Sequence, residues 1–556
     1  MPDANGAMQR RLRAATALAV AISLLSGCSR TPEAERLQGA AGSTDSNTLL
    51  LGNGPGPDSL DPQKARVSEA HEVLRDLYEC LTSLDKQAAP APGVATSWDT
   101  SADGRTYTFH LRPQARWSNG DRVVAADFLV ALRRLVDPAT ASQYAQVIDV
   151  VANARAIIAG KEPVEALGVA APDDATVVIT LAGPAPYLPG LLSHPSTCPV
   201  HRPTLARYGA DFARPGIMVS NGAFVLKEWV PGSYVLATRN HNYWNDRATH
   251  LDAVKYLQIA DENAELTRYR ADQLQVTAVV PRGQFDWIKA HLAQELHIAP
   301  QLNTYYYGFN LERAPFRDNP RLRRALSLVI DREKLAARVL RVGELPAYGW
   351  VPPGTHDYTP QSFDYRDLPL PQKLAEARQL YAAAGYSPQH PLAIELRYND
   401  GEIHTKLALA VASMWKEALG VETRLVAVEF KSLLQDIDRG DVQIFRSSWV
   451  GDYNDAYTFA QYLKSDFGIN LPRYKNPSYD KLLGQAAAEV NVATRRALLE
   501  QAERLMLADH PLMPLYFYVN KHLVKPNVTG WYDNVMNVVY SKDLGLAPPP
   551  PDSRSR

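Results

Sequence analysis

The stretch that decides the fold class is residues 103–138, DGRTYTFHLRPQARWSNGDRVVAADFLVALRRLVDP. In residues 106–111 apolar and polar side chains alternate, which predicts a half-buried strand. From Asp127 onward apolar residues recur at helical spacing, so a helix is predicted to begin there and to stop at Asp137, just before a proline. A strand followed so closely by a helix is typical of an α/β chain.

The same two patterns recur along the rest of the chain. Asn319 is a predicted N-cap, and the helix that it opens carries apolar residues on one face as far as Ile330. A second helix, over residues 407–420, is predicted to end at its final glycine and to lead into a strand over residues 421–430. No repeat or long linker interrupts residues 47–546, so the prediction is an α/β architecture of about three closely joined domains.

The composition narrows the class of protein. The chain has 556 residues, with Lys+Arg 59 and Asp+Glu 60, so its formal net charge is −1. A nucleic-acid binder needs concentrated positive charge, which this balance disfavours. Hydrophobic residues make up 46% and charged residues 21%, as in a folded soluble chain and unlike a disordered or integral membrane protein.

The N-terminus has the pattern of a secretory signal. Three arginines between positions 10 and 13 precede the apolar or small residues 14–25, a run too short to span a bilayer as a mature helix. The segment that ends at Cys28 resembles the lipobox of bacterial lipoproteins. Residues 1–27 are therefore predicted to be a lipoprotein signal peptide that is removed, and Cys28 to be acylated, which would hold the protein on a membrane.

Both ends of the mature chain are predicted to lack a fold. Residues 28–46 are polar with no apolar period and are predicted to be a flexible tether. Residues 547–556 include four consecutive prolines and are predicted to be a disordered tail. Either Met1 or Met8 can be the true start.

No motif for catalysis or phosphate binding is found in the sequence: Gly-x-Ser-x-Gly, His-Glu-x-x-His, the phosphate-binding loop and Gly-x-Gly-x-x-Gly are all missing. We therefore expect a protein that is not an enzyme and that uses no metal and no cofactor. Cys198 has His201 three residues on, but zinc needs a second such pair. A buried structural thiol is the expectation for Cys198, and whether it pairs with Cys80 stays open.

Three strand-like segments are rich in Trp and Tyr: residues 305–307, 449–454 and 516–519. Flat amphipathic rings at strand ends, with the isolated acid Asp452, are what a cleft for a small zwitterion needs. The alternative interpretation is that these are core aromatics and a turn aspartate. Each segment taken alone favours that alternative.

Taken together, many short segments resemble one family, the solute-binding proteins of oligopeptide ABC importers, which are extracellular solute-binding proteins of family 5, the peptide/nickel-binding type. The likeness runs in order along nearly the entire mature chain. The matching segments are residues 59–62, 92–95, 97–98, 103–112, 117–120, 126–128, 134–135, 137–138, 140–142, 221–223, 305–307, 315–316, 330–332, 345–348, 449–454 and 516–525.

The resemblance implies a two-lobed periplasmic-binding-protein-like fold of class II, with an additional inserted α/β domain and a hinge between the lobes. The inserted domain would be residues 80–203, and the second lobe residues 303–519. The first lobe would be built from three separate segments, residues 47–79, 204–302 and 520–546.

The resemblance also implies a ligand site. Asp452 matches the aspartate that pairs with the α-ammonium of a peptide. Arg446 and His404 match groups that meet the peptide carboxylate. The positions that would wall the side-chain pockets are Tyr144, Phe430, Trp449, Val450, Gly451 and Tyr518.

Some positions depart from the family pattern. Arg66 falls where peptide binders often carry an acid that faces the ligand amine, and Glu69 is a neighbouring acid that can also lie close to the ligand. Ile437 stands where a second carboxylate-binding arginine is common. Asn303 and Val450 occupy the two positions that form a disulfide in the best-known members.

The predicted function is that of a lipid-anchored, solute-binding component of an ABC importer, which captures short oligopeptides in a closing cleft between its lobes. Its expected partners are short peptides, the membrane subunits of an ABC permease, and a membrane through the anchor; it would act as a monomer in the cell envelope, in the periplasm or on the outer face of the cytoplasmic membrane. The alternatives are another solute (a cell-wall peptide, a metal chelate or haem) or a different class, an extracytoplasmic peptide hydrolase or chaperone.

Overall fold

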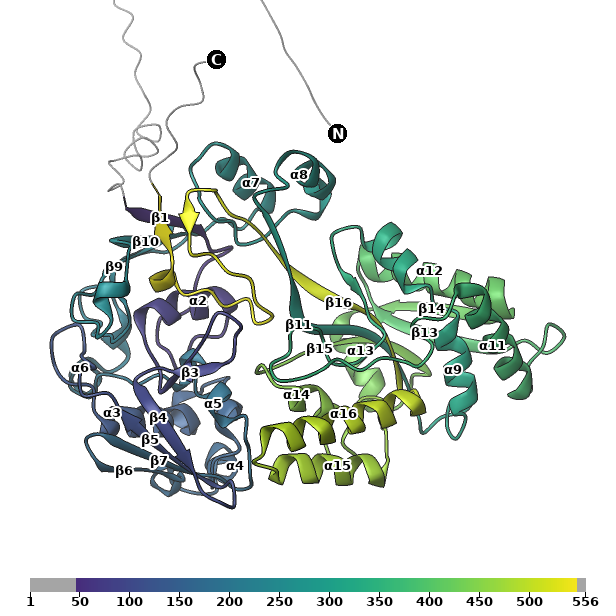
Figure 1. The fold of residues 1–556 in the computed structure, drawn as a ribbon, viewed down its shortest axis with the longest axis horizontal. Helices are drawn as coiled ribbons and strands as arrows, with labels where there is room; N and C mark the ends of the chain where they lie inside the picture. The colour runs from purple at the N-terminus through teal and green to yellow at the C-terminus, as the bar shows by residue number, and fades with distance from the viewer. Residues whose placement is uncertain (1–46, 548–556) are drawn as a thin grey trace, which may run out of the picture. The chain divides into compact units, whose positions relative to one another are not determined.

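The computed structural model of the chain describes residues 47–547, and the strands of that range form three large sheets and two small two-stranded ones. The first sheet has the order β1-β10-β9-β8, in which β1 runs parallel to β10 and the other pairs are antiparallel. Helix α2 contacts β8 (Figure 1). The bounds are β1 Thr48–Gly52, α2 Ser68–Leu77, β8 Phe224–Val230, β9 Tyr234–Arg239 and β10 Ala253–Leu257.

The second sheet has the antiparallel order β4-β5-β7-β6 and is covered by helix α3. The strand predicted for residues 106–111 is confirmed as β5, with alternate side chains buried. Helix α3 begins at Ala125, two residues before the predicted start, because the Asp127 carboxylate accepts a hydrogen bond from the Val124 amide (3.1 Å) and so lies inside the first turn. The bounds of these elements and their neighbours are β2 Thr82–Leu84, β3 Pro90–Pro92, β4 Ala95–Thr100, β5 Thr106–Leu111, α3 Ala125–Val136, α4 Ala154–Ile158, β6 Val169–Asp173, β7 Thr176–Thr180, α5 Leu188–Leu191 and α6 Arg202–Tyr208.

The third sheet has six strands in the order β12-β16-β11-β15-β13-β14. Strands β11 (Leu296–Phe309) and β16 (Leu512–Leu523) are long and pair with each other, and Figure 1 shows both running from the side of α7 and α8 into this sheet. The bounds of the other elements are α7 Glu262–Arg270, α8 Phe285–His291, α9 Pro320–Leu328, α10 Arg332–Lys334, β12 Leu345–Pro346, α11 Leu370–Ala383, β13 Ala393–Asn399, α12 Glu402–Leu419, β14 Glu422–Val428, α13 Phe430–Asp438, β15 Ile444–Val450, α14 Tyr457–Ala460, α15 Pro477–Ala488, α16 Val492–Asp509, β17 Val528–Thr529 and β18 Gly545–Leu546.

Local signals account for several of these elements. Asn319 caps α9 by accepting from the Leu322 amide (3.2 Å), as predicted. Helix α12 ends where its glycine, Gly420, takes a left-handed φ of 74°. The following strand, β14, is shorter than predicted, because Glu429 caps a new helix, α13, that starts at Phe430.

The first sheet is connected to the long crossing strands around Val276. Val276 forms bridges with both Leu51 of β1 and Val524 just after β16. Segments from the beginning, middle and end of the chain therefore meet in one place.

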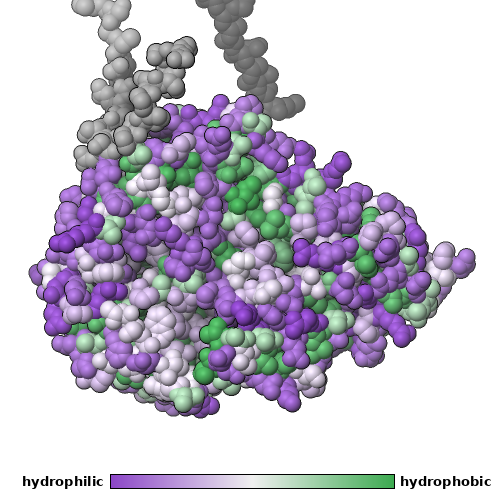
Figure 2. Space-filling model, viewed as in Figure 1, coloured by the Kyte–Doolittle hydropathy of each residue, from purple (hydrophilic) through white to green (hydrophobic). Residues whose placement is uncertain are grey.

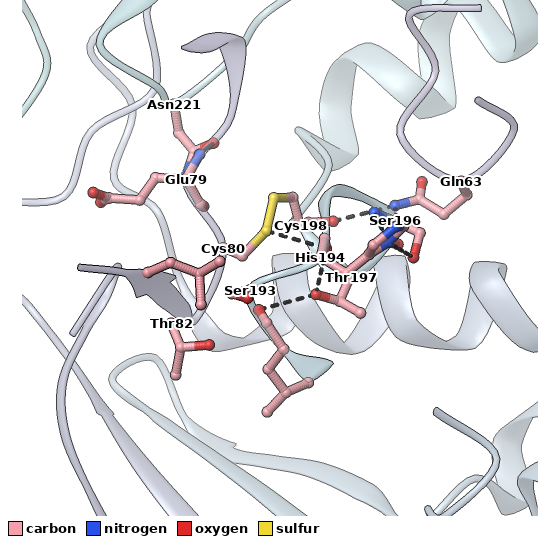
Figure 3. The surroundings of a disulfide bond; sticks show 12 residues. Gln63, Glu79, Cys80, Thr82, Ser193, His194, Ser196, Thr197, Cys198 and Asn221 are labelled. Atoms are coloured by element: carbon pink, nitrogen blue, oxygen red, sulfur yellow. Dashed lines mark hydrogen bonds between the residues drawn. A yellow bond between two sulfur atoms is a disulfide. The ribbon is translucent and has the colours of Figure 1, made fainter. Parts of the chain in front are cut away.

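A disulfide joins Cys80 to Cys198, whose Cα atoms are 4.1 Å apart although 118 residues separate them in sequence (Figure 3). Cys198 is buried, as expected, but it is half of a disulfide and not a thiol. Its pairing with Cys80, which the sequence leaves open, occurs because the chain returns beside its own point of departure after forming the second sheet. Gln63 braces this return by donating to the carbonyls of Ser196 (3.1 Å) and Cys198 (3.2 Å). Both ring nitrogens of His201 form hydrogen bonds, Nδ1 with Thr204 and Nε2 with Asp121.

The predicted signal peptide, the acylated Cys28, the tether and most of the predicted tail lie outside the described residues. Across residues 47–547 no helix is both long enough and apolar enough to cross a membrane.

Candidate functional site

The side chain of Arg446 lies in the middle of the third sheet with no acid beside it. It is only 8% exposed, and its Nη1 and Nη2 donate to Asn399 Oδ1 (3.0 Å) and Tyr518 Oη (3.3 Å). Its guanidinium lies 4.7 Å from the centre of the Tyr305 ring, and its Nε has no hydrogen-bond partner. Among residues 47–547 no carboxylate lies within ion-pair distance of it. A buried cation without a counter-ion is unfavourable unless an anion binds to it.

His404 shares the Tyr305 ring with Arg446. Its Nδ1 lies 3.2 Å from Tyr305 Oη, and the two rings stack at 5.7 Å. Burial, followed by the nearby charge of Arg446, lowers the pKa of His404 to about 4. The structure therefore places a neutral imidazole and a permanent cation around one phenol, and both groups can donate a hydrogen bond to a carboxylate.

Asp452 lies on the loop that follows β15. Its amide donates to Thr458 Oγ1 (3.2 Å), and the Gly451 amide before it donates to Leu302 O (2.8 Å). The carboxylate is open to solvent on one side, yet the protein atoms crowded around it raise its pKa, and the charge of Asp149 adds to that effect. No cation within the described part of the chain pairs with it, so an ammonium group from outside would be its first partner.

The aromatic residues predicted as pocket walls have different surroundings. Tyr144 comes from the side of the second sheet, where it stacks on His194 at 4.7 Å and donates to Arg66 O (3.3 Å). Burial raises the pKa of Tyr144, and the charge of Asp452 adds to that effect. Trp449 donates to Thr458 O (2.9 Å) and packs on Tyr462.

Phe430 and Val450 are apolar residues left 49% and 54% exposed. Figure 2 shows several apolar patches on a face of the molecule that is otherwise largely hydrophilic. Gly451 between Val450 and Asp452 is buried, and a Cβ there would overlap the Leu302 side chain. Exposed apolar side chains next to an unpaired acid provide a surface that a mixed ligand can cover.

Arg66 and Glu69 have protein partners of their own. Arg66 Nε pairs with Asp58 (2.9 Å), so its positive charge is compensated. Glu69 accepts from Ser68 Oγ (3.2 Å). Ile437 lies on the buried face of α13 and is 2% exposed, so it has no access to a ligand. Asn303 lies directly opposite Val450 in the pairing of β11 with β15.

Residues that support the site went unnoticed in the sequence. Asn399 orients Arg446, and Thr458 holds the loop of Asp452 and the indole of Trp449. Asn399 carried a weak signal, as a polar residue where a strand ends before a turn. Thr458 carried none, because its contacts depend on how the loop folds back.

The site residues do not line either of two hollows found within residues 47–547. A hollow of about 830 Å³ lies at the start of β13 and β14, where its charged residues pair with one another. Another, of about 500 Å³, lies between α8 and the first turn of α12, next to His404. The candidate site residues come instead from β15, β16, α12, α13 and the loop after β15, with Tyr144 from the segment between α3 and α4.

Comparisons with known proteins agree on one family. Residues 89–470 match the model of the bacterial extracellular solute-binding proteins, family 5. The chain is 38% identical to the periplasmic oligopeptide-binding protein OppA of Escherichia coli K12, over 88% of this chain and 90% of that one. It is also 38% identical to the periplasmic murein peptide-binding protein MppA of the same organism, over 88% and 91% of the two chains.

A solved structure of MppA in its unliganded open form superposes with a TM-score of 0.86, at 38% identity over 90% of this chain and 98% of that one. These relatives are binding proteins, which agrees with the prediction that the chain is not an enzyme. The predicted two-lobed α/β fold is confirmed by the same likeness. This chain is thus a member of the bacterial extracellular solute-binding proteins of family 5.

Proposed function

We propose that the chain captures short peptides with free termini in a cleft between two lobes and delivers them to an ABC permease. The observation that carries the proposal is Arg446, a buried cation that has no counter-ion among residues 47–547, next to a neutral His404. Asp452 supplies the opposite charge at the other end. The relatives named for oligopeptides and murein peptides support a peptide as the solute.

In this proposal Arg446 and His404 bind the ligand carboxylate, and Asp452 binds the α-ammonium. Backbone contacts along the cleft would resemble those of an added strand, so they would tolerate many side chains. Tyr144, Trp449 and Tyr518, together with the exposed Phe430 and Val450, would surround those side chains, and Gly451 would let the loop before Asp452 lie close to Leu302. Arg66 is neutralised by Asp58 and would repel the ligand amine only weakly.

The proposed domains follow the sheets. The first lobe comprises residues 47–79, 204–302 and 520–546, the inserted domain residues 80–203, and the second lobe residues 303–519. Strands β1, β8, β9 and β10 fall in the first lobe, β4 to β7 in the inserted domain, and β13 to β15 in the second lobe. The proposed lobe boundaries fall inside β11 and β16, which supports a hinge at these two paired strands.

Lipid anchoring is a separate proposal that rests on the sequence around Cys28. A Cys28→Ser protein should lose acylation and accumulate as an unprocessed or mislocalised precursor. Normal labelling of that variant with a radioactive fatty acid would refute the anchor.

The ligand class is tested by mass spectrometry of protein exposed to a peptide mixture and then purified. Intact co-purified peptides are the expected result. Recovery of a cell-wall peptide, a metal chelate or haem would favour the alternative solutes, and cleaved peptides would favour a hydrolase.

The roles of the termini are tested by calorimetry with tri- to pentapeptides whose N-terminus is free or acetylated. Acetylation should weaken binding to the wild type by about 2 to 5 kcal/mol, because it leaves Asp452 unpaired in a closed cleft. Asp452→Ala should lose a similar amount for free peptides only, and the two changes should not add. Asp438→Ala, which removes an exposed acid of α13, is the matched control. Equal affinity of the wild type for both peptides would make Asp452 a structural turn residue.

A further inference from the structure

The loop that carries Asp452 also joins the second sheet's part of the molecule to the third sheet's part. The ring of Tyr453 stacks on Tyr187, just before α5, with centroids 4.5 Å apart and planes 9° apart. Tyr457 stacks on the same ring at 5.4 Å. Figure 1 shows α5 and α14, the helices next to these residues, side by side.

A second contact adds hydrogen bonds to this stack. Asn454 Nδ2 donates to the carbonyl oxygens of Ala88 (2.9 Å) and Gln87 (3.4 Å), while its Oδ1 accepts from the His356 amide (2.9 Å). Tyr453 and Asn454 are only 5% and 6% exposed. The contact is therefore packed, and both ends of the Asn454 amide are hydrogen-bonded, whereas the buried Tyr453 hydroxyl has no partner among the described residues.

Asp452 lies between two fixed points of this loop. Before it, Gly451 is bonded to Leu302 of β11; after it, Tyr453 and Asn454 are held by Tyr187 and Ala88. Further along, Asp455 forms a two-pronged ion pair with Arg495 (2.7 and 2.8 Å). Of these supports, only the one at Tyr453 and Asn454 comes from the region of β2, β3 and α5.

We propose that Tyr187 is a positioning residue for the amine end of the ligand: it acts through Tyr453 to hold Asp452 where an ammonium group can meet it. This inference rests on the proposed role of Asp452. A charge-assisted hydrogen bond is strong only within a narrow range of distance, so a loop that samples other positions loses much of it. The inserted domain thereby contributes to affinity by restricting the loop before the ligand arrives.

The inference predicts a selective effect. Without the Tyr187 ring, the protein should still bind the peptide backbone and carboxylate through residues outside this loop. Only the part of the affinity that depends on a free amine should fall. A merely structural role for Tyr187 would instead weaken free and acetylated peptides alike.

The test uses calorimetry with trialanine and N-acetyl-trialanine on the full-length protein. The preference of the wild type for the free peptide should fall about tenfold in Tyr187→Ala, the factor that corresponds to losing a good aromatic pair. Asn454→Asp should also reduce it, because a carboxylate oxygen would face the Ala88 carbonyl. This second variant keeps the size of the side chain, so it carries the test if Tyr187→Ala fails to fold.

Tyr386→Ala is the control, because its ring stacks on His390 within the third sheet's part of the molecule and away from the loop; it should keep the wild-type preference. In an Asp452→Ala background, Tyr187→Ala should cause no further loss for trialanine. A wild-type preference that survives in both Tyr187→Ala and Asn454→Asp would overturn the positioning role alone. A wild type without any preference for the free amine would overturn the proposed role of Asp452, and this inference with it.

Discussion

Glu503 of α16 is a buried acid whose ionisation should weaken the fold. It is 3% exposed, and its Oε1 accepts from the amides of Trp350 (2.6 Å) and Val351 (3.0 Å) while its Oε2 accepts from the Tyr358 hydroxyl. Burial raises its pKa from 4.5 to about 7, against the opposing effect of these hydrogen bonds. The native state therefore holds a proton that the unfolded chain releases at lower pH.

The sign of the pH dependence follows from that difference. Below about pH 4.5 both states are protonated, and Glu503 contributes no dependence on pH. Between about 4.5 and 7 the native state binds more protons than the unfolded state, so the free energy of unfolding falls as the pH rises. Above pH 7 the loss levels off at about 3 kcal/mol, the equivalent of the rise in pKa.

Glu503→Gln removes the charge and keeps the shape. The glutamine oxygen can accept from the same two amides, and its amide can donate to the Tyr358 hydroxyl. We expect the variant to match the wild type at pH 4, where both states are protonated, and to exceed it by about 3 kcal/mol at pH 8. Guanidinium unfolding followed by circular dichroism at both pH values measures this difference.

The control is Glu500→Gln, one turn earlier on α16, whose carboxylate lies at the edge of ion-pair distance from Arg496 (3.9 Å). It should show no gain at pH 8. If Glu503→Gln destabilises the protein equally at both pH values, the carboxylate is ionised in the native state and the reasoning is wrong. Burial also raises the pKa of Glu72 and Glu265 to about 7, so part of the wild-type slope should remain.

Three further predictions concern the site and its supports. Replacing Cys80 and Cys198 together by alanine should lower the free energy of unfolding by up to about 4 to 5 kcal/mol, because the loop they close is long, and should leave peptide affinity intact at 25 °C; an unchanged guanidinium midpoint would contradict this. Gly451→Ala should weaken peptide binding and cost about 1 to 3 kcal/mol of stability through overlap with Leu302, whereas Gly468→Ala, which has open space around it, should not; equal behaviour of the two variants would refute the close approach. A peptide carboxylate next to His404 should raise the pKa of the imidazole from about 4, so affinity should increase as the pH falls from 7 to 5. Calorimetry at pH 5.5 in two buffers of different ionisation enthalpy should detect proton uptake on binding by the wild type and little by His404→Gln.

The sequence predicted elements whose signals are local. The alternation of residues 106–111 and the cap at Asn319 each depend on a few neighbouring residues, and both elements are present in the structure. The predicted end of β14, residue 430, is two residues too late. An apolar residue such as Phe430 fits a strand as well as the start of a helix, and only the cap at Glu429 distinguishes the two.

Features that depend on distant contacts could not be predicted from residue patterns. The sheet order β12-β16-β11-β15-β13-β14 joins strands far apart in the chain, and two cysteines 118 residues apart carry no sign that they meet. For the site, the family resemblance supplied Asp452, Arg446 and His404. The contacts of Thr458 and Tyr187 depend on how the loops fold and which distant segments meet, so no sequence motif predicts them.

The bridges of Val276 bear on how the protein is made. The second sheet lies within residues 95–180 and can form as soon as that segment is available. The first sheet begins with β1 but must wait for β10, and its connection through Val276 requires Val524, near the end of the chain. A chain that emerges from its N-terminus therefore leaves β1 unpaired until residues 253–276 have appeared, and it leaves Val276 without its second partner until synthesis or export is almost finished. Compact structure is delayed accordingly in a polypeptide whose relatives are periplasmic.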